Sequence, residues 1–581
     1  MKQRFSAQTQ TSLRGTLLIL CLVMLFSAGM PQVKPAQAQS PLPGEEHIFL
    51  PIVINPTSGA VSIDHVEVTQ AVQDGQNSVA LIAGRPTLLR IYTTGTGFTQ
   101  ATLPVKVSIT SKSSNNSLAS ASQVILASAS PASSQDNYAS TINYKLPSTW
   151  LSGTVDLTVK LSTGNQTNGV DQNENGYSLH LTFNPVPPLD IKIVPIEYTD
   201  TYDHVTYSAP SRDTISDWIF RTYPISQVKI SWHAKIAFTG DLTTSTDFGN
   251  LLTKISSIKN AENAPAGQVY YGLIPTASGA KTWFHGGIAG LGWVGSRIAI
   301  GLDYSNQSSQ IAAHEIGHNL GMQHTPCGTA GGTDASYPYP GASIGHYGVD
   351  IVTGQVYTPS FKDVMSYCDP KWISDYTYKA LLNSQVKYGA VSESALSLQS
   401  ERSSAGHRGL LVRANITGQG AELLPAYVLA GRPHAAPEAG EYQVQVFGTN
   451  GEMLTSVPVR AYSAGEPGET QISAIQALIP LPDTPAGQVR LVKGDRVLAE
   501  QPLQTVTMSK VGGMSVEPVE NGYRVRWASS GQPALVRYSS DNGATWSILG
   551  MDLQGTETTI PTSSLPDQNG TFDVVQAGVW K

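Results

Sequence analysis

The stretch from residue 314 to residue 324 reads HEIGHNLGMQH, and its side chains could hold a metal ion. His314 and His318 are four residues apart, so on a helix both imidazoles project from one face. Gly321 permits the positive φ that ends a helix, and the turn would bring His324 back as a third ligand. Three histidine ligands leave one coordination position open, which is typical of a catalytic zinc site rather than a structural one.

Glu315 stands directly after the first histidine. On a helix its carboxylate lies beside the ligands, where it can act on the attacking water rather than bind the metal. Zinc polarises a carbonyl group and lowers the pKa of water towards about 7, so the expected reaction is hydrolysis. We therefore predict one catalytic Zn2+ ion, with Glu315 passing the proton of the water to the leaving group. The alternative, ordinary core or surface histidines, would require the whole pattern to arise by coincidence.

Residues 363–368 read DVMSYC and follow the third histidine by about forty residues. Together with the zinc motif, this segment resembles the metzincin zinc metallopeptidases, in which a Met-turn follows the zinc helix. The resemblance implies that Met365 has a structural role, as an apolar floor beneath the three histidines. It also implies a catalytic role for Tyr367, whose hydroxyl would reach the zinc or the oxyanion of the tetrahedral intermediate. Taken alone, both residues would be interpreted as ordinary core residues.

The surrounding sequence is similar to that of secreted bacterial members related to mucin-cleaving metallopeptidases. The similarity lies in TPCG after the third histidine and YCDPKWISDYTY after the Met, and it extends over about residues 190–390. It implies an α/β (α+β) catalytic domain of two lobes, with the substrate held as an extended strand in the cleft between them. The expected partner is a protein substrate, and glycoproteins are candidates.

The rest of the chain predicts a multidomain protein in which all-β Ig-like sandwich domains flank this metzincin-like domain. Runs that alternate apolar and polar residues, separated by Gly, Asn and Ser clusters, indicate the flanking strands. A tract at 111–134, rich in Ser and Ala, predicts a loop. The predicted division is a signal peptide at 1–38, a linker at 39–57, an N-terminal all-β Ig-like domain at 58–186, the zinc peptidase domain at 187–389, an all-β domain at 400–505 and a C-terminal all-β domain at 506–581.

Strands and helices must position the zinc helix within the central domain. Ser308 or Ser309 could cap the start of that helix. A Gly-rich stretch at 285–295, beginning with His285, could line the cleft or form a surface loop. We predict strands at 190–197, 228–232, 269–275 and 297–302, and helices at 209–221 and 246–261.

The N-terminus predicts export. Basic residues precede an apolar run at 17–26, and residues 36–38 read AQA, a cleavage site for a signal peptide. The run is too short for a typical membrane span, so we expect a secreted, extracellular protein without one. Removal of residues 1–38 would take away four basic residues and no acidic residue, changing the net charge from −7 to −11. With no basic stripe, this charge argues against nucleic acid as a partner.

Two cysteines remain after this processing, Cys327 and Cys368. Both flank the proposed metal site, and export permits oxidation, so we predict that they form a disulfide bond. Such a bond would close a separation of 41 residues. It could stabilise the fold by about 3–4 kcal/mol in the chain-entropy interpretation. The competing interpretation is that the two thiolates help to form a second zinc site.

Two further motifs have weaker functional interpretations. Residues 539–546, SSDNGATW, match the Asp-box of sialidases, which predicts a β-hairpin rather than glycosidase chemistry. Residues 171–176 copy the first half of an EF-hand loop, but Thr182 stands where the bidentate Glu is required. A hairpin turn is therefore favoured there, and calcium is the weaker alternative.

Two other functions compete with peptide hydrolysis. The flanking β-domains would suit a glycan- or surface-binding adhesin with a structural zinc site, although such a site needs no carboxylate at Glu315. The Asp-box would suit a glycoside hydrolase, but no carboxylate pair is recognisable. The N-terminal β-domain has no cysteine, which excludes a cysteine-switch propeptide in that region.

Overall fold

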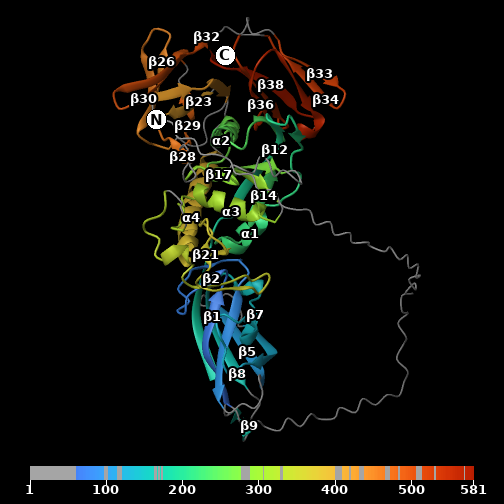
Figure 1. The fold of residues 1–581 in the computed structure, drawn as a ribbon, viewed down its shortest axis with the longest axis vertical. Helices are drawn as coiled ribbons and strands as arrows, with labels where there is room; N and C mark the ends of the chain where they lie inside the picture. The colour runs from blue at the N-terminus through green and yellow to red at the C-terminus, as the bar shows by residue number, and fades with distance from the viewer. Residues whose placement is uncertain are drawn as a thin grey trace, which may run out of the picture. The chain divides into compact units, whose positions relative to one another are not determined.

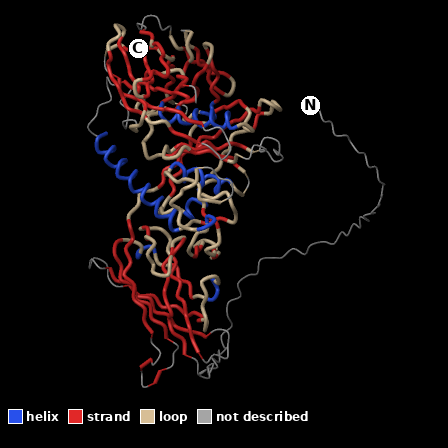
Figure 2. Tube along the Cα trace, turned by 60° about the vertical axis from the view of Figure 1, so that its left-hand side comes forward, coloured by secondary structure: helices blue, strands red, loops and turns tan. Residues whose placement is uncertain are grey.

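The computed structural model describes residues 60–580, apart from 97–102, 114–120, 163–165, 168–169, 172–174, 277–287, 305, 328–331, 400–407, 418–419, 431–437, 465–471, 482–483, 506–512, 529–530 and 568. The signal peptide and linker predicted at 1–38 and 39–57 lie outside the described residues, as does His285. Strands make up most of the regular structure (Figure 2). Among the described helices, none has the length and apolarity needed to cross a membrane.

The N-terminal region forms two sheets that share one apolar core. On β8 the residues at alternate positions 155, 157, 159 and 161 are buried, which is the period of a strand with one face in a core. The three-stranded sheet contains β1 (Ala60–Thr69), β4 (Leu88–Thr96) and β7 (Ile142–Lys145). The five-stranded sheet has the order β3 (Leu81–Ile82), β11 (Asn175–Asn184), β8 (Gly153–Ser162), β5 (Leu103–Ser113) and β6 (Ala121–Ala129).

This region agrees with the predicted all-β character but corrects one prediction. Part of the tract expected to be a loop at 111–134 is the edge strand β6, which pairs with β5. Of the segment with EF-hand character, Asp171 ends the short strand β10 (Val170–Asp171), which pairs with β9 (Gln166–Thr167). Residues 172–174 lie outside the described residues, and Thr182 belongs to β11.

A mixed sheet forms the centre of the region that carries the zinc motif. Strand β16 is buried at every position, as expected for a parallel strand covered on both faces. The strands of the sheet have the order β13 (Thr206–Tyr207), β12 (Leu189–Asp200), β16 (Val269–Pro275), β18 (Ile298–Asp303) and β17 (Gly290–Gly292). Two more strands, β14 (Val228–Trp232) and β15 (Ile236–Gly240), also pair with β12. The edge strand β17 runs antiparallel to β18.

Helices cover both faces of this sheet (Figure 1). Helix α2 (Ser245–Ala261) packs on one face, and α1 (Ser216–Thr222) and α3 (Ser308–Asn319) pack on the other. Of the helix predicted at 209–221, only the part from residue 216 onward is helical, as α1. Helix α4 (Asp375–Gln399) continues past the domain end predicted at residue 389. The predicted serine cap is wrong, because α3 has no side-chain cap and the Ser308 hydroxyl donates to Asp303 Oδ1 at 3.0 Å.

The described residues from 408 to 580 form further sheets, most of them antiparallel. One has the order β24 (Gly420–Leu423), β23 (Arg408–Thr417), β29 (Ile472–Leu481) and β28 (Tyr462–Ala464), with β25 (Tyr427–Ala430) beside β23; a second has the order β27 (Met453–Val459), β26 (Tyr442–Gly448), β30 (Ala486–Lys493) and β31 (Arg496–Pro502). A third contains β33 (Ser515–Val519), β34 (Gly522–Arg526) and β37 (Glu557–Pro561), and a fourth β36 (Ser547–Leu553), β35 (Ala534–Ser539) and β38 (Thr571–Gln576).

Contacts connect the two all-β regions predicted at 400–505 and 506–581. Strand β32 (Gln504–Thr505) pairs in parallel with β39 (Val579–Trp580), and Arg413 donates to both carboxylate oxygens of Asp552, at 2.6 and 2.8 Å. The hairpin predicted from the Asp-box is confirmed, since β35 and β36 pair with each other. In the turn of this hairpin, the Asp541 carboxylate accepts hydrogen bonds from the backbone N–H and the hydroxyl of Thr545.

Candidate metal centre

Three histidines converge at the end of helix α3. The helix presents His314 and His318 from one face, while Ala312 and Ile316 are buried in the core beneath the central sheet. Gly321 has a φ of +95° and turns the chain, as predicted, so that His324 comes back towards the helix. The potential ligand nitrogens of the three histidines all lie within 4.8 Å of one another. The structure therefore brings together the three predicted ligands.

Backbone carbonyls fix the orientation of two of the rings. The Nδ1 atom of His314 lies 2.9 Å from the Val364 carbonyl oxygen, and Nδ1 of His318 lies 2.8 Å from that of Met322. Since a carbonyl can only accept, each Nδ1 carries the proton and each Nε2 offers a lone pair to the centre. The buried Nε2 of His314 has no hydrogen-bond partner within the described part of the chain. A buried nitrogen of this kind is suited to a divalent metal ion, so the residues fit zinc.

The surroundings of the rings keep them neutral. Burial, together with the neighbouring His318 and His324, lowers the pKa of His314 well below its usual value. Burial and His324 lower the pKa of His318 to about 3. Neutral imidazole is the form that binds a metal, so neither ring must lose a proton at neutral pH.

The segment predicted as a Met-turn lies directly beneath α3. Met365 is buried, and a Cβ atom at Gly317 would lie 2.4 Å from its sulfur. Glycine at position 317 is therefore what allows the sulfur to reach the helix between the two ligands. The Met365 carbonyl also accepts from the backbone N–H of Thr325 at 3.0 Å, next to His324.

Asp363 holds this turn from inside the protein, a role that sequence reasoning missed. Its side chain is fully buried, and Oδ1 accepts from the Met365 backbone N–H at 2.9 Å. Oδ2 accepts from the backbone N–H and the hydroxyl of Ser374, at 3.0 and 2.6 Å. Burial raises the pKa of Asp363, and these hydrogen bonds oppose that rise. Asp followed two residues later by a hydrogen-bonded backbone N–H is a recognisable turn signal.

Tyr367 is the partly exposed member of the cluster. Its side chain is 40% exposed, and its hydroxyl lies 3.0 Å from Nε2 of His324. The tyrosine two residues after Met365 is thus brought to the histidines, on a side open to solvent.

Glu315 is buried between α3 and the edge strand β17. A Cβ atom at Gly290 would lie 2.6 Å from Cγ of Glu315, and one at Gly292 would lie 2.5 Å from the Glu315 carbonyl oxygen. Only glycine lets this strand approach so closely. The Gly-rich stretch was expected to line a cleft or form a surface loop. Within its described part, Gly290–Gly292 form the buried strand β17, so the surface-loop interpretation is wrong for these residues, and Gly290 and Gly292 pack against Glu315.

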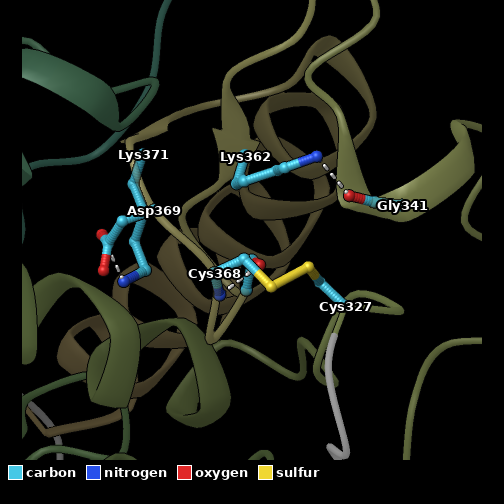
Figure 3. The surroundings of a disulfide bond; sticks show 7 residues. Cys327, Gly341, Lys362, Cys368, Asp369 and Lys371 are labelled. Atoms are coloured by element: carbon cyan, nitrogen blue, oxygen red, sulfur yellow. Dashed lines mark hydrogen bonds and ion pairs between the residues drawn. A yellow bond between two sulfur atoms is a disulfide. The ribbon is translucent and has the colours of Figure 1, made fainter.

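The predicted disulfide between Cys327 and Cys368 is confirmed (Figure 3). Their Cα atoms are 6.0 Å apart, within the usual range, and the bond joins positions 41 residues apart in sequence. Near it, the Lys362 ammonium donates to the Gly341 carbonyl oxygen at 2.9 Å (Figure 3). The bond ties the segment that follows His324 to the segment that follows Met365.

Replacing Gly317 with Ala is expected to destabilise the protein by about 1–3 kcal/mol, because the new methyl group would overlap the sulfur of Met365. A glycine-to-alanine change inside a helix ordinarily stabilises by about 0.5–1 kcal/mol, so the sign of the change is the test. Denaturant unfolding of both forms measures it, with Gly75→Ala, which has open space for a methyl group, as the control. A stabilised Gly317→Ala variant would show that Met365 does not press on the helix.

Comparison with known proteins supports a metallopeptidase. Residues 241–362 match the family model Peptidase M66. The match contains all three histidines and Glu315, and it ends just before Asp363. Peptidase M66 is a metallopeptidase family, which supports a peptidase function with a protein substrate.

No curated protein matches the chain. Among solved structures, a beta-glucuronidase of glycoside hydrolase family 2 is 8% identical over 89% of this chain and 60% of its own length, with a TM-score of 0.14. A Parabacteroides merdae beta-glucuronidase is 7% identical over 89% of this chain and 74% of its own, with a TM-score of 0.14. Bacteroides uniformis beta-glucuronidase 2 is 8% identical over 89% of this chain and 79% of its own length, with a TM-score of 0.15. TM-scores this low do not indicate a shared fold.

Proposed function

We propose that this protein is a secreted zinc-dependent endopeptidase of the metzincin type, acting on extracellular proteins, glycoproteins included. The observation that carries the proposal is the cluster of three imidazoles, one of whose Nε2 atoms is buried with no hydrogen-bond partner among the described residues, next to the helix position of the buried Glu315. The match of residues 241–362 to a metallopeptidase family supports the reaction class. Secretion rests on the signal-peptide pattern of residues 1–38.

His314, His318 and His324 would hold the metal. A bound zinc ion would supply Lewis acidity for the scissile carbonyl and for the attacking water. Glu315 would take the proton of that water and pass it to the leaving amine. The contact with Gly290 and Gly292 holds its carboxylate against the edge strand, so little reorganisation is needed.

Tyr367 would assist at the carbonyl oxygen. Its hydroxyl already lies 3.0 Å from Nε2 of His324, and its side chain reaches solvent. A donor at this position can stabilise the negative charge that develops on the oxygen during attack.

The test is zinc stoichiometry combined with cleavage of casein and of a mucin-type glycoprotein, before and after deglycosylation, with and without a chelator. We expect one zinc per chain and cleavage that stops on chelation and returns on addition of zinc. Loss of cleavage on deglycosylation would identify the glycoprotein as the preferred substrate class. Bound zinc without cleavage of any substrate would favour an adhesin with a structural zinc site, and protein without zinc would contradict the proposal.

A further inference from the structure

The N-terminal β-region contributes residues to the core beneath the metal centre. Strand β2 (Val72–Gln73) pairs with β19 (Tyr347–Val349), which in turn pairs with β20 (Val356–Tyr357). Ala71, Val72 and Ile82 are buried in the same apolar cluster as Met365 and Ile316. The cluster that supports the zinc helix is therefore built from both regions, although the sequence predicted a boundary between them at residue 186.

Arg85 makes three hydrogen bonds from the N-terminal β-region to the region of the metal centre. Its guanidinium is buried, and it donates to the backbone carbonyls of Phe220, Arg221 and Ile225, at 2.6, 2.9 and 2.8 Å. Helix α1 ends at Thr222, so the first two carbonyls belong to the last turn, which lacks partners inside the helix. Without Arg85, these carbonyl oxygens, of which that of Ile225 is buried, would lose their partner.

Helix α1 passes this support on to the zinc helix. Immediately after α1, the Tyr223 hydroxyl donates to the carbonyl oxygen of Ala313, the residue before the first ligand, His314. The contact from Arg85 therefore reaches α3 through one short helix.

A second path begins at the carbonyl oxygen of Ala71. It accepts from the indole N–H of Trp372 and from the backbone N–H of Val349, each at 2.8 Å. Trp372 lies in β22 (Lys371–Trp372), which pairs with β21 (Lys362–Asp363), and its partner in the register is Asp363. Asp363 accepts from the backbone N–H of Met365 and so holds the turn at 363–365. Within this turn, the carbonyl oxygen of Val364 accepts from Nδ1 of His314.

We propose that residues 71–85 are a positioning element of the metal centre, and that the N-terminal β-region is a permanent part of the peptidase rather than a prosegment released on activation. This inference rests on the proposed function. The path from Arg85 reaches helix α3, which carries His314, and the path from Ala71 reaches the turn that binds the His314 ring. Separation of the two regions would remove the hydrogen-bond partners of Arg85 and of the buried indole N–H of Trp372. Release would also expose apolar surface around Trp372, which is now fully buried.

The first experiment cuts the connection between the two regions in the full chain. A protease recognition sequence is inserted after Pro185, which is exposed and lies between β11 and β12. After cleavage we expect the two fragments to elute together and to keep their metal and peptidase activity. Fragments that separate while the C-terminal one keeps or gains activity would overturn the inference.

The second experiment compares two buried arginines of the same region. Arg85→Met removes the contact with α1, whereas Arg90→Met removes an arginine that faces Glu67 and the Gln135 carbonyl inside the N-terminal sheets. We expect Arg85→Met to weaken Co2+ and Zn2+ binding by about 10–100-fold and to alter the visible absorption of the Co2+ form. Arg90→Met should lower the melting temperature with unchanged metal affinity.

Equal metal affinities and identical Co2+ spectra in the two variants would overturn the positioning role. Wild-type protein that binds no metal would instead contradict the proposed function. In that case the cleavage experiment still decides whether the N-terminal region is permanent, because co-elution is read without metal.

Discussion

Replacing Glu315 with Gln is expected to lower peptide hydrolysis by about 10²–10⁴-fold, with metal content and melting temperature unchanged. Glutamine keeps the shape that fits against Gly290 and Gly292 but cannot take a proton from water at neutral pH. His314 and His318 do not depend on this carboxylate for their orientation, since their Nδ1 atoms donate to backbone carbonyl groups. Initial rates under saturating and subsaturating substrate, with zinc measured on the same samples, test the expectation.

The matched control is Glu262→Gln, which changes a glutamate with a buried side chain at the C-terminal cap of α2, on the face of the central sheet opposite to α3 and its histidines. We expect this variant to keep its activity below its own melting temperature. Normal turnover in Glu315→Gln would show that another group is the base. Loss of zinc together with activity would show that Glu315 supports the site rather than the reaction.

The metal centre could be predicted because its parts are close in sequence. Two ligands follow from the helical repeat, and the third follows from one glycine with positive φ. Strands at 228–232 and 269–275 were predicted at their observed bounds, because each is a short run of β-branched and aromatic residues. Helix α2 was predicted to within one residue at its start.

Other features depend on contacts that no local pattern reveals. Ser308 or Ser309 was expected to cap α3, but the helix has no side-chain cap, and the Ser308 hydroxyl donates to Asp303 instead. Strand β6 is rich in Ser and Ala, which have little preference for strands, and its pairing with β5 decides its conformation. The contact of Gly290 and Gly292 with Glu315 depends on the packing of β17 against α3, which no local pattern predicts.

The contacts between the N-terminal region and the region of the metal centre join residues that are far apart in the sequence. The hydrogen bond from Trp372 to Ala71 joins residues 301 positions apart, and those from Arg85 to α1 join residues about 135 apart. In the sequence, Arg85 is simply the first residue of RPTLLRIYT, a run that predicts a strand. Domain boundaries inferred from pattern alone therefore separate residues that share one buried cluster.

Replacing Glu262 with Ala is expected to lower the free energy of unfolding by about 3–5 kcal/mol, since it breaks a buried network of charges. Oε1 accepts from His233 Nε2 at 2.6 Å and from the Ile548 backbone N–H at 2.8 Å. Oε2 accepts from the Tyr270 hydroxyl at 2.6 Å and from the Lys192 ammonium at 3.3 Å. The carboxylate thus joins α2 and the central sheet to strand β36. Glu197→Ala, which breaks a partly exposed pair with Lys235, is the control and should cost under about 1 kcal/mol.

The effect of Glu262 should also depend on pH. Burial alone would raise the pKa of its carboxyl group, but His233, Lys192 and Tyr270 outweigh burial and hold that pKa at about 2. Because this folded-state value lies below the ordinary value of about 4.5, the contribution is complete above pH 4.5 and is lost as the pH falls towards 2. The difference of roughly 2.5 pKa units corresponds to about 3 kcal/mol. Denaturant unfolding at several pH values should therefore show wild type and Glu262→Ala converging by about that amount in acid. Curves that stay parallel down to pH 2 would mean that the carboxylate contributes packing rather than charge, because only a charge contribution disappears on protonation.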